Sequence, residues 1–207
     1  MAKAPGGYER SVFINCPLDG QFKPLFDTAV FAVQIAGFKP RCALEASNAG
    51  QIRLEKIMAI ISSCQYGIHD ISRTEIGSNG LPRFNMPLEL GLDLGCRRYG
   101  SGRHKDKRLL VLDKRRHRYQ KFISDIAGQD IESHQNSRSQ LVRCIRDWLS
   151  TESGDATIPG GPYIYKRYRA FQRALPIHCQ NLRLSLEQLT FGDLSRLVRI
   201  WLEENET

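Results

Sequence analysis

Apolar and polar positions alternate in blocks along the first 150 residues, and each block has the period of a strand or of a helix. Short β-branched and aromatic runs predict strands over 11–16, 39–44, 66–71 and 108–112, with a fifth short strand near 130–132. Apolar residues at helical spacing predict helices over 22–36, 52–64, 85–94 and 137–149. This alternation predicts an α/β fold, a doubly wound parallel sheet of five strands with the flavodoxin-like order 2-1-3-4-5.

The third of these helices carries local signals at its start and along one side. Asn85 is predicted to be its N-cap, because Pro87 then falls in the first turn, where a missing N–H costs nothing. Gly91 and Gly95 lie about one turn apart and predict a seam of close packing against the sheet.

The last 50 residues have a different pattern. Residues 150–155 resemble a linker, and a break with two prolines and two glycines follows at 159–162. Beyond it, amphipathic helices are predicted at about 163–175 and 186–203. Because so short a segment cannot bury a comfortable core alone, we divide the chain into an α/β domain, 1–150, and a helical appendage, 156–207. The appendage would dock on the main domain or on a second subunit, so we expect a homo-oligomer.

Composition narrows the class of protein. No apolar run approaches the roughly 20 residues that cross a bilayer, and residues 1–7 lack the apolar core of a signal peptide. We therefore expect a cytoplasmic protein with no membrane partner. The six cysteines show no metal-type spacing and sit mostly in apolar runs, so they are expected to be reduced core thiols. No metal and no cofactor are expected.

The positive charge is concentrated in one stretch of the chain. Between Arg97 and Lys121 there are eleven Lys or Arg residues against two Asp, within a chain of net charge +8. Such a stretch can bind nucleic acid or phosphate, with Tyr99, Tyr119 and Phe122 interleaved. A solvated, solubilising loop is the favoured interpretation of the same residues.

Four carboxylates fall at predicted strand ends or at a helix start, where a doubly wound fold binds its ligand. Asp19 follows the first strand, Glu45 the second, Asp70 ends the third, and Glu89 opens the helix after it. Each has a structural alternative: a turn residue for Asp19, loop surface for Glu45, a turn cap for Asp70, and an interaction with the helix dipole for Glu89.

Together, two of these carboxylates suggest a reaction. Near a helix N-terminus the dipole is expected to keep Glu89 ionised, so that it can act as a nucleophile or stabilise an oxocarbenium ion. Asp70 could then hold or protonate the leaving base. Arg53, near the start of the second helix, could meet a phosphate or form an ion pair with Glu55. We interpret His69 as a satisfied core histidine.

Two common nucleotide-binding motifs do not occur in the chain. The glycines at 77–80 lack the Lys-Ser/Thr of a P-loop, and no G-x-G-x-x-G follows the first strand. An ordinary dinucleotide oxidoreductase is therefore disfavoured.

The run Tyr66-Gly-Ile-His-Asp-Ile-Ser, followed by Asn85-Met-Pro-Leu-Glu-Leu-Gly-Leu-Asp-Leu-Gly, resembles the core of nucleoside 2-deoxyribosyltransferase-like proteins. These proteins have a flavodoxin-like fold and are distantly related to TIR-like NAD-cleaving domains. The resemblance implies that Glu89, followed by Gly91, attacks C1′ of the sugar and that Asp70 contacts the base.

The same resemblance, which covers about residues 11–115, implies a ligand pocket that begins at the first strand and its loop. Phe13-Ile-Asn-Cys-Pro-Leu-Asp matches this part of the family. The chain departs from the family at residues 85–87, where a small pair is usual, and it lacks an Asp between residues 74 and 84. With Glu45 and Arg53, which are candidates from their own positions, the side chains expected to contact a substrate are Cys16, Pro17, Asp19, Glu45, Arg53, Asn85 and Met86.

Three functions follow, in order of preference. The first is cleavage or transfer of an N-glycosidic bond in a nucleoside, nucleotide or NAD-type substrate, which the resemblance links to bacterial defence. The second is a non-catalytic nucleotide-sensing module that signals through the C-terminal helices. The third is a nucleic-acid-binding protein that uses the basic stretch 97–121.

Overall fold

The computed structural model describes residues 7–45, 50, 52–75, 80 and 82–205. Its strands are β1 (Ser11–Asn15), β2 (Lys39–Arg41), β3 (Tyr66–Asp70), β4 (Arg108–Asp113) and β5 (Ile131–Ser133). Its α-helices are α1 (Lys23–Ile35), α2 (Arg53–Ser62), α3 (Asn85–Tyr99), α4 (Arg138–Ser153), α5 (Gly161–Asn181) and α6 (Phe191–Glu204). The predicted polar loop at 46–50 and the turn at 77–80 lie largely outside the described residues.

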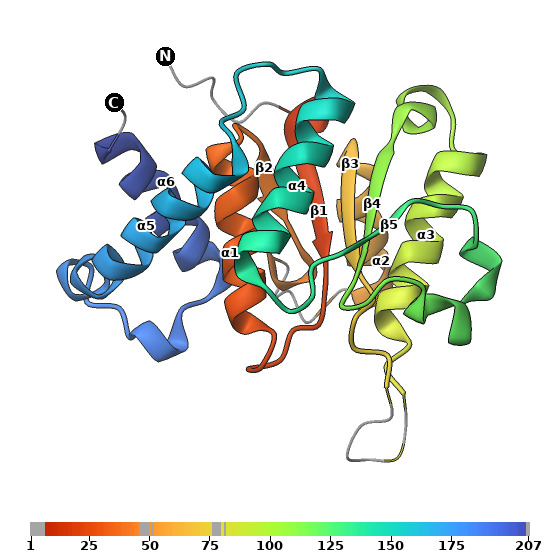
Figure 1. Cartoon of the computed structure of the whole chain (residues 1–207), viewed down its shortest axis with the longest axis horizontal. Helices are drawn as coiled ribbons and strands as arrows, with labels where there is room; N and C mark the ends of the chain where they lie inside the picture. The colour runs from red at the N-terminus through yellow and green to blue at the C-terminus, as the bar shows by residue number, and fades with distance from the viewer. Residues whose placement is uncertain (1–6, 46–49, 51, 76–79, 81, 206–207) are drawn as a thin grey trace.

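The five strands form one sheet in the order β2-β1-β3-β4-β5, and every neighbouring pair is parallel. This confirms the predicted flavodoxin-like fold. All five residues of β1 and of β3 are buried, as expected for strands covered on both faces. The topology brings the carboxyl ends of the strands to one edge of the molecule, which is the lower edge in Figure 1.

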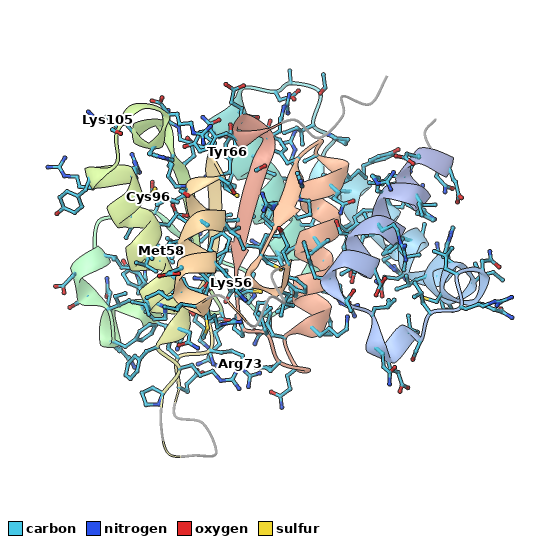
Figure 2. The ribbon with its side chains drawn as sticks, turned by 180° about the vertical axis from the view of Figure 1, so that it is seen from behind. Lys56, Met58, Tyr66, Arg73, Cys96 and Lys105 are labelled. Atoms are coloured by element: carbon cyan, nitrogen blue, oxygen red, sulfur yellow. The ribbon has the colours of Figure 1, made fainter. Side chains whose placement is uncertain are left out.

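Helices cover both faces of the sheet. Helices α1 and α4 pack together on one face, and α2 and α3 pack together on the other (Figure 1). The largest apolar cluster lies on the α1 and α4 side, whereas two smaller clusters lie beneath α2 and α3. Figure 2, seen from the α2 and α3 side, places Tyr66 and Lys105 at the amino edge of the sheet and Arg73 at the carboxyl edge.

The C-terminal helices share the core of the α/β unit. Phe31 of α1 lies 5.4 Å from Phe171 and 5.5 Å from Tyr168 of α5, and 5.9 Å from Trp201 of α6, between ring centroids. Buried aromatic contacts of this kind stabilise docking beyond the area they bury. The appendage therefore docks on α1 and α4 of its own chain, and the homo-oligomer stays a prediction.

Several helix boundaries differ from the predicted ones, among them the end of α3, at Tyr99 rather than residue 94, and the start of α6, at Phe191 rather than residue 186. Residues 150–153, predicted as a linker, form the last turn of α4, which ends at Gly154 with φ 66°. Helix α5 is longer than predicted and contains Pro176. Asn85 is the first helical residue rather than the N-cap, and no side chain caps α3.

The predicted glycine seam is wrong. A Cβ at Gly91 or Gly95 would meet nothing within 4 Å, so neither glycine is required by close packing. The close approach occurs at Gly67 of β3, where a Cβ would fall 2.5 Å from Asp93 Oδ2 and 2.9 Å from His69 Nε2. The glycine that allows the helix and the sheet to approach closely therefore lies on the sheet and not on the helix.

The cysteines lie mostly in the core, as their apolar surroundings in sequence predict. All six cysteines are free thiols, and only Cys96 is not fully buried. None of the described helices combines the length and apolar character needed to cross a membrane.

The basic stretch does not form one continuous solvent-facing surface. Lys107 is fully buried, and Tyr119 is 5% exposed. Arg118 donates to Asp113, and Lys114 pairs with Glu75. Part of the positive charge of this stretch is therefore buried or paired with carboxylates of the protein itself and cannot bind phosphates. This weakens the nucleic-acid hypothesis.

Candidate functional site

Polar side chains gather at the carboxyl edge of the sheet. Asn15, Asp70, Asp113 and Ser133 are the last residues of β1, β3, β4 and β5, and His134 follows β5 directly. Each is at most 4% exposed. Buried polar groups normally have full hydrogen-bonding partners. Among the described residues, none is a well-aligned partner for Asp70 Oδ2, Asp113 Oδ2, Ser133 Oγ or His134 Nε2, so this edge has unused hydrogen-bonding capacity.

Glu89 lies on α3 and is 8% exposed. It is the fifth residue of the helix and therefore lies just beyond the first turn. The helix dipole favours an ionised carboxylate mainly within the first turn, so its effect on Glu89 is reduced. Burial raises the pKa of Glu89 to about 7, and the charge of Arg53 lowers it only in part. The expectation that Glu89 stays fully ionised is therefore wrong, because loss of solvent outweighs the helix dipole at this position.

The buried thiol of Cys16 interacts electrostatically with both predicted catalytic carboxylates. Burial, and then the charge of Asp70 with a smaller contribution from Glu89, raise the pKa of the Cys16 thiol well above its ordinary value. Both carboxylates thus act on the same buried thiol, although Asp70 ends a strand and Glu89 lies on a helix. With its pKa raised, Cys16 is a neutral, apolar neighbour of this pair and not a nucleophile. Pro17 is buried beside it.

Asp70 is held from two sides. Its Oδ1 accepts a hydrogen bond of 2.9 Å from the Ser72 backbone N–H, which is the turn-cap role considered from sequence. Its Oδ2 lies 3.1 Å from His134 Nε2. The angle there is too poor for a formal hydrogen bond, so the contact is an ion-pair-type approach that a small rotation would align.

An unusual turn orients His134. Its Nδ1 accepts a 3.0 Å hydrogen bond from the Asn136 N–H, so in the neutral ring the proton resides on Nε2, the nitrogen that lies 3.1 Å from Asp70 Oδ2. Gln135 and Asn136 both adopt left-handed backbone conformations, with φ 52° and 55°. Two successive non-glycine residues in that region store strain, which is characteristic of functional sites.

Asp19 joins two loops at this edge. Its carboxylate accepts from the Gln21 and Phe22 N–H groups, as a turn residue does. It also pairs with Arg83 and with Arg73, 3.4 Å away, both from the segment between β3 and α3. Burial raises the pKa of Asp19, but these hydrogen bonds and charges outweigh it and hold the pKa below its ordinary value.

The other predicted substrate contacts are unequal. Glu45 accepts from Arg41 and from the Cys42 N–H, so it is engaged within its own 3-10 turn. Arg53 is exposed and acts electrostatically on Glu89. Asn85 is exposed, whereas Met86 is buried and offers its carbonyl to Asn15.

The structure confirms His69 as a satisfied core histidine. Its Nδ1 lies 3.1 Å from Asn15 Nδ2, and its Nε2 lies 3.0 Å from Asp93 Oδ2. Asp93 in turn lies 3.1 Å from Lys107. Neither Asp93 nor Lys107 was singled out from sequence, because each reads as a surface charge in a polar helix or a basic loop.

At β4, Asp113 is clamped by Arg118, which donates through Nε at 2.8 Å and also reaches the Ile71 carbonyl at 2.7 Å. Burial first, with a contribution from Asp70, raises the pKa of Asp113. Asp113 and Asp70 therefore lie near enough to repel each other. Within the described residues, no three His, Cys, Asp or Glu side chains stand close enough together to hold a metal ion.

Comparison with known proteins adds no relative. No family model matches the chain, and no curated protein or solved structure gives a significant match. The assignment of a function therefore depends on the residues of this edge.

Proposed function

We propose that the protein cleaves or transfers the N-glycosidic bond of a nucleoside, nucleotide or NAD-type substrate at the carboxyl edge of its sheet. The observation that supports this most is that two buried carboxyl groups of the carboxyl edge, Glu89 and Asp70, both act electrostatically on Cys16. Glu89 is a buried carboxyl with a pKa of about 7, whereas Asp70 is held by Ser72 and His134. Two carboxyl groups in different environments can take different roles in one reaction.

In the proposed reaction, ionised Glu89 attacks the anomeric carbon. The C–N bond breaks, its electron pair leaves with the base, and the base takes up a proton. Water then displaces Glu89 in hydrolysis, or a second base does so in transfer. A pKa of about 7 leaves roughly half of Glu89 ionised at neutral pH. Positive charge that develops on the sugar would favour the ionised form.

Asp70 is proposed to contact the base. The Ser72 N–H fixes one oxygen, and His134 Nε2 lies 3.1 Å from the other, so the carboxylate is held before substrate binds. His134 keeps its Nε2 proton, because a neutral imidazole that lost it would become an anion, and the leaving base takes its proton from solvent water. His134 is thus added to the proposed site.

Arg53 gives the proposal a substrate preference. It is an exposed cation whose field reaches Glu89, so a phosphate bound to it would lie beside the reacting sugar. Phosphorylated substrates are therefore expected to react faster than free nucleosides.

The experiment is a base-release assay. The full-length protein is incubated with nucleosides, nucleotides and NAD, and free base is measured by chromatography. Glu89→Gln tests the nucleophile, and Glu203→Gln, an exposed carboxylate on α6, is the matched control. Release that is lost in Glu89→Gln and kept in Glu203→Gln supports the proposal, as does a rate that rises with pH through about 7. Release that is equal in wild type and Glu89→Gln would refute it.

One observation favours a second function, nucleotide sensing without turnover. Asp70 is 2% exposed and Glu89 is 8% exposed, so little of either group is open to attack a substrate. A sensor would show a nucleotide-dependent rise in Tm and no base release from any member of the panel.

A further inference from the structure

A chain of four buried polar side chains runs from the end of β1 to the start of β4. Asn15 Nδ2 donates to the Met86 carbonyl at 2.9 Å and contacts His69 Nδ1 at 3.1 Å. His69 Nε2 lies 3.0 Å from Asp93 Oδ2, and Asp93 Oδ1 lies 3.1 Å from Lys107 Nζ. Asn15 is 3% exposed, and the other three side chains are fully buried.

The proton positions in this chain follow from its ends. Asn15 must present its NH₂ group to the Met86 carbonyl, because its oxygen there would face another acceptor. The second amide hydrogen then points to His69 Nδ1, which accepts it. His69 is therefore a neutral ring that carries its proton on Nε2 and donates it to Asp93. Lys107 also donates to the Ile61 and Cys64 carbonyls.

The chain holds α3 on either side of Glu89. Met86 lies three residues before Glu89, and Asp93 lies four residues after it. In a helix these positions are neighbours along one face. The helix is therefore attached to β1 through Met86 one turn before Glu89, and to β3 and Lys107 through Asp93 one turn after it.

Stability alone does not explain this arrangement. A buried ion pair recovers little more than its desolvation cost, and apolar residues of the same size often stabilise a core equally well. Gly67 is also required, since a Cβ there would overlap Asp93 and His69. The glycine at position 67 and the buried ion pair together fix the orientation of α3 against the sheet.

We propose that Asn15 and His69, with Asp93 and Lys107 behind them, are positioning residues that set the depth at which Glu89 is buried. This deepens the proposed function, since Glu89 is its nucleophile. None of the four residues is assigned a contact with substrate. Loss of the Asn15 or His69 link lets the first turns of α3 move away from the sheet and brings solvent to Glu89.

The test is a ¹³C NMR titration of the side-chain carboxyl groups in protein labelled at glutamate, with the Glu89 signal assigned from Glu89→Gln. Asn15→Leu and His69→Leu remove the links. Asn15→Ser is a milder variant that keeps a folded core if either leucine variant does not fold. His69→Gln retains one donor and one acceptor. Val142→Ala, in the core of α4 away from Glu89, is the control for loss of stability alone.

We expect Asn15→Leu, Asn15→Ser and His69→Leu to lower the pKa of Glu89 by about one unit or more, toward that of a solvated carboxyl. His69→Gln and Val142→Ala should titrate like wild type. If the first three variants melt at lower temperature while Glu89 titrates like wild type, the chain is only structural and the proposal is overturned. This readout needs no substrate, so its failure is separate from the absence of base release.

Discussion

His134 Nε2 lies 3.1 Å from Asp70 Oδ2, although Asp70 ends β3 and His134 follows β5, two strands away in the sheet. The intervening strand, β4, ends at Asp113, whose carboxylate accepts a hydrogen bond from Arg118. This pair of an acid and a base lies at the carboxyl edge of the sheet. It brings together two segments separated by more than 60 residues of chain.

Replacing His134 should affect catalysis more than stability. In His134→Leu, Asp70 loses the group that faces Oδ2 and the Asn136 N–H loses its acceptor. We expect a loss of about 2 kcal/mol in unfolding free energy and a fall in base release of roughly 100-fold, because Asp70 is then less well oriented toward the base. Chemical denaturation and the base-release assay measure the two effects. His178→Gln, on α5, is the control and should leave both unchanged.

Glu89 makes stability depend on pH. Burial raises its pKa from 4.5 to about 7, so the folded state binds this proton more tightly than the unfolded state does. At pH 4 the carboxyl is protonated in both states, and its ionisation costs nothing. As pH rises from 4.5 to 7, the unfolded chain ionises this carboxyl while the folded protein keeps it protonated, so wild type loses about 2 kcal/mol relative to Glu89→Gln, allowing for partial solvation.

Urea denaturation of wild type and Glu89→Gln at pH 4.5, 6 and 8 checks this dependence. The stability difference should grow in favour of Glu89→Gln across the series. A difference that is the same at every pH would show that Glu89 titrates in the folded protein as it does in the unfolded chain.

Gly67→Ala should be strongly destabilising, because its Cβ would fall 2.5 Å from Asp93 Oδ2 and 2.8 Å from Leu109 Cδ2. Overpacking of this kind costs about 1–3 kcal/mol. Gly91→Ala is the matched control, since its Cβ meets open space within α3, and it should gain about 0.5–1 kcal/mol through helix propensity. Thermal melting of both variants measures the difference in stability, and equal Tm values for Gly67→Ala and Gly91→Ala would contradict the steric argument.

Lys107→Met should leave Asp93 as an unpaired buried charge and cost about 3–5 kcal/mol. The double variant D93L/K107M removes both charges and should regain a large part of that loss, although His69 then lacks an acceptor. Denaturation of the single and double variants measures the coupling. If the two losses simply add, Lys107 and Asp93 are independent.

The sheet was predictable because its signals are local. Apolar runs and turn residues mark each strand of a parallel sheet, and alternation with helices leaves few topologies. The strand order and the placement of Asp70 at a strand end followed from this. The docking of α5 and α6 on α1 was one of two predicted outcomes, since amphipathicity shows that a helix needs a partner but not which one.

The site was only partly predictable, because its interactions are long-range. Lys107 belongs to a basic run in sequence, and only the fold shows that it enters the core to meet Asp93. His134 follows a three-residue strand, too short to give a clear pattern. The state of Glu89 was mispredicted since the dipole rule uses helix position alone, whereas desolvation depends on what packs around the side chain. Burial of single polar residues is the information that the sequence pattern lacks.

The two margins of the sheet have a consequence for how the protein behaves in concentrated solution. Strands β2 and β5 are each three residues long, and β2 carries Pro40, which has no N–H to offer another chain. Helix α6 also reaches the turn that follows β2. Short edge strands, and edge strands that contain proline, are poor templates for the addition of another strand. The folded protein is therefore expected to resist intermolecular strand pairing, which is the usual first step toward insoluble fibres.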